Sequence, residues 1–319
     1  MSPAVTAPAI SGISAQAQVW FNNPMTLKSS IRPFVYKGEK AVQAARFASL
    51  SEPQAGWPIL LGISFPKSGT HLLDQILLGF SKVAPFARRL HSFFAGYEGE
   101  SGLKRSLGET LEWVDSLRPL DVASAHLFAW PEVVDRVTRP AFVPYFIFRD
   151  PRDVAVSHVF YVTDMEPDHV HHSYYRSLPD FDSRLRASIL GRSDPSVAVQ
   201  AADVEFPDLA GRFAPYLGWL DQPSVLKIHF EDLVNDRARS LNLILDHLLA
   251  RIGTATLRTS RASTLAFLEA SINPGRSPTF RSGKTGEWRK YFTDEHKRIF
   301  KDVAGELLVK LGYEKDNNW

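Results

Sequence analysis

Short apolar runs, each followed by a turn and then by apolar residues at helical spacing, recur along this chain. In the first unit, residues 57–65 (WPILLGISF) precede a turn at residues 66–70, and residues 71–80 (HLLDQILLGF) have helical periodicity. In the second, residues 143–148 (VPYFIF) precede a turn at residues 149–152 and further helical residues. Strands that alternate with helices predict an α/β fold, with a mostly parallel central sheet flanked by helices.

Two more strands are expected at residues 224–230 and 121–125, the latter directly before His126. Helices are expected at residues 237–252 and 295–311. In open sheets of this kind, ligands bind at the carboxyl ends of the strands. The segments that should carry the chemistry are therefore the turn at 66–70, His126 and the turn at 149–152.

Composition narrows the class of protein. The 319 residues are 44% hydrophobic and 23% charged, which suits one globular domain, and the formal net charge of +2 argues against a nucleic-acid binder. The sequence has no cysteine, which excludes disulfides, thiolate metal sites and a cysteine nucleophile, and fits a cytoplasmic protein. No run reaches the ~18 apolar residues of a membrane span.

Domain organisation follows from where the apolar pattern begins. Residues 1–55 are expected to form a partly disordered N-terminal extension with one short helix at 40–49, and residues 56–319 a single domain. Within it, residues 163–205 are polar and irregular in pattern, which predicts a variable insertion or lid.

The first turn has the features of a phosphate-binding loop. In FPKSGTH, Ser68, Gly69 and Thr70 can present backbone N–H groups at a helix N-terminus, and Lys67 adds a positive charge. An ordinary turn capped by a serine would look similar. The lysine precedes the Ser-Gly-Thr run, so this is not the Gly-Lys-Ser/Thr pattern of ATPases.

Two later segments are also cationic. In FRDPRDVAVS, Arg149 ends a strand and Ser157 lies further along the following helix, although a surface network of arginine and aspartate would give the same letters. In RSGKTGEWRKYFT, Arg281 and Lys284 stand beside Gly283 and Gly286, which could let backbone amides face an anion; a solvated basic turn is the alternative.

Together these three segments resemble the sulfotransferases that use 3′-phosphoadenosine-5′-phosphosulfate (PAPS). They stand in the family's order and with similar spacing, and two weaker matches, AHL at 125–127 and HFEDL at 229–233, lie where the family has similar segments. The resemblance spans about residues 57–312. It implies an α/β fold with a phosphosulfate-binding loop, and an enzyme that transfers a sulfuryl group to a hydroxyl group.

The resemblance also implies roles for individual residues. Lys67 would act on the oxygen that bridges phosphorus and sulfur, and His126 would be the general base. The remaining residues implied to bind the cofactor are Ser68, Gly69, Thr70, His71, Arg149, Ser157, Phe230, Arg281, Ser282 and Gly283. No metal is expected; a metal site at His169, His171 and His172 is the weaker interpretation of those histidines.

Three positions depart from the family pattern. Leu72 stands where many members have a tryptophan that stacks on adenine, Phe230 replaces a tyrosine, and Ser124 replaces a lysine two positions before the histidine. These departures affect the expected adenine contacts more than the phosphate contacts.

The acceptor is expected to be a small hydroxylated molecule with apolar surface. Candidate pocket residues are Phe93, Phe94, Tyr97, Trp130 and Tyr161, each of which could instead be a core residue. Two other functions stay open: a nucleotide kinase-like P-loop enzyme, and a non-catalytic module that binds PAPS or adenosine 3′,5′-bisphosphate (PAP). The sequence does not indicate an oligomeric state.

Overall fold

The two predicted strand–turn–helix units lie next to each other at the centre of one five-stranded sheet. The computed structural model describes residues 57–95, 105–191, 206–253, 257, 259–277 and 280–319. Strand β1 (Ile59–Ser64) pairs with β4 (Phe142–Phe148) on one side and with β3 (Val122–His126) on the other. Strands β2 (Leu90–Phe94) and β5 (Leu226–His229) form the edges, giving the order β2-β3-β1-β4-β5. Every pairing is parallel, which confirms the predicted α/β fold.

The register brings the carboxyl ends of the central strands to the same edge of the sheet. Ile63 of β1 lies opposite Ala125 of β3 and Phe146 of β4. The residues that follow, in the first loop, at His126 and at Arg149, therefore leave the sheet side by side. This is the edge at which ligands bind in parallel α/β sheets.

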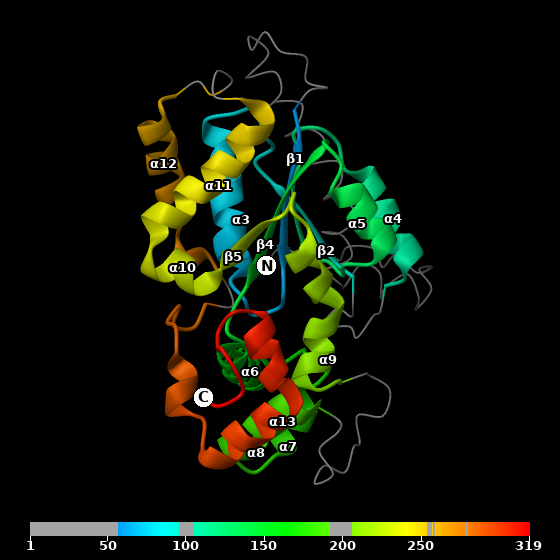
Figure 1. Cartoon of the computed structure of the whole chain (residues 1–319), viewed down its shortest axis with the longest axis vertical. Coiled ribbons are helices and arrows are strands. Elements are labelled where there is room, and N and C mark those ends of the chain that lie inside the picture. The colour runs from blue at the N-terminus through cyan, green and yellow to red at the C-terminus, as the bar shows by residue number, and fades with distance from the viewer. Residues whose placement is uncertain (1–56, 96–104, 192–205, 254–256, 258, 278–279) are drawn as a thin grey trace, which may run out of the picture.

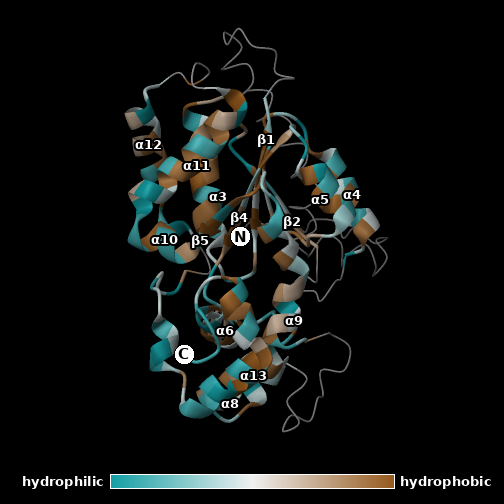
Figure 2. Ribbon diagram, in the orientation of Figure 1, coloured by the Kyte–Doolittle hydropathy of each residue, from teal (hydrophilic) through white to brown (hydrophobic). Residues whose placement is uncertain are grey.

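Helices cover both faces of the sheet (Figure 1). Helices α3 (Thr70–Gly79), α10 (Phe230–Asn235), α11 (Arg237–Ile252) and α12 (Arg261–Glu269) supply the apolar core of one face. Helices α4 (Leu107–Ser116) and α5 (Pro131–Val137) cover the other face. Figure 2 shows both apolar and polar residues along these helices. The apolar ones belong to the two core clusters that pack on the faces of the sheet.

A second group of helices lies beyond the carboxyl edge of the strands (Figure 1). It consists of α6 (Pro151–Phe160), a π-helical turn (Tyr161–Met165), α7 (His172–Ser177), α8 (Phe181–Leu190), α9 (Leu209–Phe213) and α13 (Asp294–Lys310). Short 3₁₀ helices span Phe80–Lys82, Ala214–Asp221, Pro274–Arg276 and Glu287–Lys290. Among the described residues, no helix is long and apolar enough to cross a membrane.

The structure adds elements that the sequence pattern did not predict. Strand β2 and helices α4, α5, α9 and α12 were not expected, and the described part of the segment 163–205 is largely helical rather than irregular. Helix α4 has a capping box at Ser106 and Glu109, a signal that the sequence contains. The expected helix at 40–49 lies outside the described residues.

Arg152 belongs to the structural framework rather than to the phosphate-binding charge. Its guanidinium pairs with Asp150 at 2.8 Å and with Glu314 at 2.6 Å. It lies 4.1 Å from the ring centroid of Trp288 and 4.6 Å from that of Trp319. The sequence left open a surface network of arginine and aspartate at this turn. Arg152 does form such a network, but the network is buried.

We expect Arg152→Ala to destabilise the fold strongly, because the substitution leaves the buried Asp150 without its main partner. Loss of one member of a buried pair costs about 3–5 kcal/mol of unfolding free energy. Urea denaturation measures this change. Arg139→Ala is the matched control, because the Arg139–Asp135 pair is more than half exposed and should change stability by less than about 1 kcal/mol. Equal effects of the two substitutions would contradict the assignment.

Candidate active site

The first loop forms a tight cradle at the N-terminus of α3. Lys67 has φ 66° and Gly69 has φ 97°, so the chain turns sharply between β1 and the helix. The first N–H groups of a helix have no partner within it, and at α3 they face the carboxyl edge of the sheet. A Cβ on Gly69 would lie 2.6 Å from the ring of Phe230, so only glycine fits between the loop and α10. The loop therefore has the geometry of an anion-binding turn.

Lys67 lies in an unusual environment. Its Nζ lies 3.8 Å from the centroid of the Tyr161 ring, in the π-helical turn. Burial, together with the nearby positive charges of Arg149 and Arg281, lowers the pKa of Lys67 to about 7. These couplings show that the three cationic segments predicted from the sequence converge on one point.

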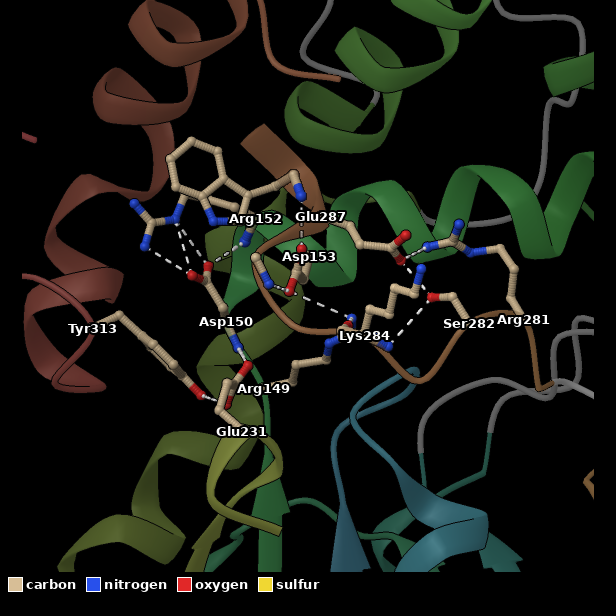
Figure 3. A network of polar contacts seen from close by, with 12 residues as sticks. Arg149, Asp150, Arg152, Asp153, Glu231, Arg281, Ser282, Lys284, Glu287 and Tyr313 are labelled. Carbon is tan, nitrogen blue, oxygen red and sulfur yellow. Dashed lines mark hydrogen bonds and ion pairs between the residues drawn. The ribbon is translucent and has the colours of Figure 1, made fainter. Parts of the chain in front are cut away.

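Arg149 is held at the end of β4 by groups from three directions. Its guanidinium donates to the carbonyl oxygen of Lys284 at 2.7 Å, lies 3.4 Å from Asp153, and stands 4.7 Å from the ring centroid of Phe230. Figure 3 shows it reaching from its strand toward the third segment. Its Nε is buried and has no hydrogen-bond partner among the described residues. The Nε–H of the Arg149 guanidinium therefore remains available to a ligand.

The third segment is fastened to α6 through Asp153. The two carboxylate oxygens of Asp153 accept the amides of Trp288 at 2.8 Å and Gly286 at 2.7 Å (Figure 3). Within the segment, Arg281 pairs with Glu287 at 2.5 Å and Ser282 donates a short hydrogen bond to the same carboxylate. Arg281 and Ser282, which the family resemblance assigns to the cofactor phosphate, are thus both bonded to the Glu287 carboxylate.

Two polar side chains in the cradle and at the end of β3 complete the site. Ser68 is fully buried, and its hydroxyl has no hydrogen-bond partner among the described residues. His126 bonds through Nδ1 to the carbonyl oxygen of Ser64 at 2.9 Å, and its ring lies 5.0 Å from that of Phe94. Burial lowers the pKa of His126 to about 4, so the imidazole is neutral near pH 7.

The candidate pocket residues separate into groups. Phe94 and Tyr161 lie beside His126 and Lys67 respectively. Phe93 points to the opposite face of β2, because successive strand residues alternate, and stacks on Trp113 in the core at 4.8 Å. Trp130 caps α5 and packs against Phe128. Tyr97 lies outside the described residues.

Of the other predicted cofactor residues, His71 and Thr70 open α3, and Ser157 lies on α6. Gly283 has φ 63°, a left-handed conformation, and Phe280 packs against it. Leu72, on α3, is half-buried and packs against the apolar core that α3 and α11 share.

Sequence reasoning missed Asp74. This carboxyl group lies one helical turn beyond the cradle, hydrogen-bonded to Ser124, and burial raises its pKa to about 7. One of its oxygens is 3.9 Å from Nδ1 of His71. An aspartate inside an apolar helix pattern, opposite a serine in a predicted strand, is the signal that could have indicated it.

The buried histidines form a cluster that differs from the metal site considered in the sequence, which was His169, His171 and His172. His158, His169 and His171 each offer a ring nitrogen, all within 4.8 Å of one another, whereas His172 bonds to the carbonyl oxygen of Val162. Nδ1 of His169 accepts the amide of His171 at 3.1 Å, which leaves the proton of that ring on Nε2. The three rings also contact one another, with centroids 6.1 Å apart for His158 and His169 and 5.3 Å apart for His169 and His171.

With the geometry in place, comparison with known proteins decides the family. The family model described as "Sulfotransferase domain" matches residues 59–312. The chain belongs to the sulfotransferase domain family. It is accordingly a sulfotransferase of the PAPS-dependent class, as the sequence resemblance implied.

A solved sulfotransferase structure has a similar fold. A mouse sulfotransferase, SULT7A1, in complex with PAP is 17% identical, with a TM-score of 0.52, over 83% of this chain and 89% of that one. Retinol dehydratase, in complex with androsterone and the inactive cofactor PAP, is 16% identical, with a TM-score of 0.49, over 85% of each chain. The comparison with curated proteins finds no match.

We expect Lys67 of this sulfotransferase to titrate near pH 7 in the free protein. It should be charged below that pH and neutral above it, because burial and two guanidinium groups disfavour its ammonium form. A pH titration of the side-chain resonances of ¹³C-labelled lysine measures this directly. The signal should disappear in Lys67→Arg and persist in Lys82→Arg, an exposed control. Titration of every lysine above pH 9 would contradict the expectation.

Proposed function

We propose that this enzyme transfers the sulfuryl group of PAPS to a hydroxyl group of a small acceptor, in line and without a metal, with His126 as general base. The observation that carries the proposal is the convergence of Lys67, Arg149 and Arg281 on one point beside the first loop. A cluster of three neighbouring cations suits a ligand that carries several negative charges.

The residues present fit such a ligand. The buried hydroxyl of Ser68 and the buried Nε of Arg149 lack partners among the described residues, and buried polar groups normally have them. An anion bound in the first loop would satisfy Ser68, and a second one near Arg149 would satisfy its Nε. Two separated donors match the two anionic ends of PAPS, the 5′-phosphosulfate and the 3′-phosphate.

The groups at the first loop would act on the reacting atoms. Bound PAPS supplies a sulfur atom whose bond to the 5′-phosphate oxygen breaks as its bond to the acceptor oxygen forms. Lys67 would stabilise the electron pair left on that phosphate oxygen, with Ser68, Gly69, Thr70 and His71 holding the phosphate. An anion beside Lys67 raises its pKa, so binding would favour the charged form that burial, Arg149 and Arg281 disfavour.

His126 would take the proton of the acceptor hydroxyl. Its Nδ1 faces a carbonyl oxygen, which only accepts, so Nδ1 carries the proton in the neutral ring and Nε2 keeps its lone pair. The low pKa of His126 means that the imidazole is neutral at neutral pH and has a lone pair that can take a proton.

The 3′-phosphate is assigned to the second and third segments. Arg149 would hold it from the end of β4 and Ser157 from α6, and Arg281, Ser282 and Gly283 would hold it from the third segment. In the structure, Glu287 binds Arg281 and Ser282, so the phosphate would have to replace that carboxylate. Phe230 lies under Arg149 and against Gly69, where it would pack on the adenosine.

The acceptor would approach His126 from the side of Phe94 and Tyr161. Both rings are apolar surfaces beside the reacting groups, which suits a small hydroxylated molecule with apolar area. We further propose that residues 56–319 form the whole catalytic domain, with residues 163–205 as a lid. A cytoplasmic location is part of the proposal, since a chain without cysteine suits a reducing compartment.

Incubation with ³⁵S-labelled PAPS and a panel of hydroxylated compounds, in the presence of EDTA, tests the proposal. We expect transfer to at least one acceptor, and a loss of kcat of about 10²-fold or more in Lys67→Ala and in His126→Ala. Turnover of ATP with magnesium would favour a kinase-like enzyme instead. Binding of PAP without any transfer would favour a non-catalytic module.

Arg149→Ala should mainly weaken PAP binding, because it removes a charged fork without touching the reacting atoms. We expect a rise in Kd of about tenfold or more, the scale of one charged hydrogen bond, measured by calorimetry. Arg139→Ala, on an exposed pair away from the site, is the control. An unchanged Kd in Arg149→Ala would place the 3′-phosphate elsewhere.

A further inference from the structure

Glu287, in the short 3₁₀ helix of the third segment, is bonded to two of the donors that the proposed function gives to the 3′-phosphate. Its Oε2 atom accepts a hydrogen bond from Nη2 of Arg281 at 2.5 Å and another from the hydroxyl of Ser282 (Figure 3). Only 9% of the Glu287 side chain is exposed. The positive charge of Arg281 also helps to lower the pKa of Lys67, after burial and Arg149, so this contact lies at the anion site.

The hydroxyl of Ser282 makes this contact incompatible with a phosphate bound in the same place. A serine hydroxyl has one proton, so it donates to one acceptor at a time. While that proton is directed to Glu287, Ser282 has none to offer a phosphate oxygen. A phosphate beside the carboxylate would also be repelled by its negative charge. Binding of the 3′-phosphate through Arg281 and Ser282 therefore requires the carboxylate to leave them.

The backbone around Glu287 is held independently of this contact. The amides of the two neighbouring residues, Gly286 and Trp288, both donate to the carboxylate of Asp153, at 2.7 Å and 2.8 Å. Asp153 belongs to α6, so the attachment stays in place whichever group binds Arg281. An exchange of carboxylate for phosphate thus needs a rotation of the Glu287 side chain and no rearrangement of the loop.

Lys290 offers the displaced carboxylate a second positive charge. It is exposed and lies one turn beyond Glu287 on the same short helix. Burial raises the pKa of the Glu287 carboxyl group, but the hydrogen bond from Ser282 and the charges of Arg281 and Lys290 outweigh it. The pKa is therefore lowered, and the group is ionised at neutral pH. The carboxylate has a cation to face both before and after it gives up Arg281.

We propose that Glu287 is a specificity-determining residue that competes with the 3′-phosphate for Arg281 and Ser282. The inference rests on the proposed function, because it takes these two residues as phosphate ligands. A phosphate monoester carries about −1.5 to −2 charges at pH 7, more than one carboxylate, so it wins the exchange. It gains only the difference between its own bonds and those of Glu287, however, whereas a nucleotide without a 3′-phosphate leaves the internal contact in place.

The competition limits how tightly the nucleotide is held after transfer. PAP keeps the 3′-phosphate of PAPS, so the product binds the same donors as the cofactor. As the phosphate withdraws, Glu287 takes Arg281 and Ser282 back, and neither donor is left without an acceptor. Release of the product nucleotide is faster for this reason.

The test compares PAP with adenosine 5′-monophosphate (AMP), which lacks the 3′-phosphate, by calorimetry on the full-length protein. Glu287→Gln keeps the size of the side chain and removes its charge. We expect the Kd for PAP to fall by about fivefold or more, the difference between a charged and a neutral hydrogen bond, and the Kd for AMP to stay the same. Stopped-flow displacement should show that most of the change is slower release of PAP.

Two further substitutions separate the contact from a general effect of charge. The charge of Glu166 acts on Lys67, and Glu166→Gln also removes one negative charge from the site, so it should change the Kd values for PAP and AMP by the same factor. Lys290→Ala removes the second cation that faces Glu287. It should weaken PAP binding more in the wild-type background than in Glu287→Gln, and equal weakening in both would contradict the exchange.

The outcomes distinguish the inference from the function on which it rests. An unchanged or higher Kd for PAP in Glu287→Gln, or a fall that AMP shares, overturns the competition and leaves the proposed function intact. Absence of PAP binding to the wild type overturns both. If Glu287→Gln does not fold, Glu287→Asp shortens the side chain by one methylene group and should also tighten PAP binding. An unchanged or weaker affinity there overturns the competition.

Discussion

One buried carboxylate holds the two ends of the site together. Asp153 accepts the amides of Gly286 and Trp288 and faces Arg149, which in turn donates to the carbonyl oxygen of Lys284. The segment around Gly286 is thereby fixed near the end of β4, although Gly286 is 133 residues from Asp153 in the sequence. The position of Arg281 relative to Lys67 depends on this attachment.

The site that results is under electrostatic strain. Burial, followed by the positive charges of Arg149 and Arg281, lowers the pKa of Lys67. The protein moderates this in two ways: the Tyr161 ring lies against the ammonium group, and Glu287 holds Arg281. A polyanion that binds here relieves repulsion as well as forming bonds, which is why specific binding does not need a basic molecular surface.

The sequence predicted those features of the fold and the site that depend on neighbouring residues. The cradle at residues 66–70, the strand end at Arg149 and the fold class depend on apolar periodicity and turn residues, and the structure and family match confirm the fold. It could not place Arg152, because whether an arginine in RDPRD faces a ligand or two tryptophans is decided by Trp288, in a short helix before α13, and by Trp319, beyond α13. Nor could it find the role of Glu287, of Asp74 or of Ser64. Each depends on a partner from a distant strand or helix, and such pairings follow from sheet order rather than from neighbouring letters.

The strand order β2-β3-β1-β4-β5 also bears on how the enzyme reaches its active form. Lys67, His126, Arg149 and Arg281 come from segments far apart in the chain, and non-local pairings form slowly because long loops must close first. The four side chains therefore come together only once these segments have assembled. A nucleotide that contacts all four would stabilise the assembled fold relative to partly folded states.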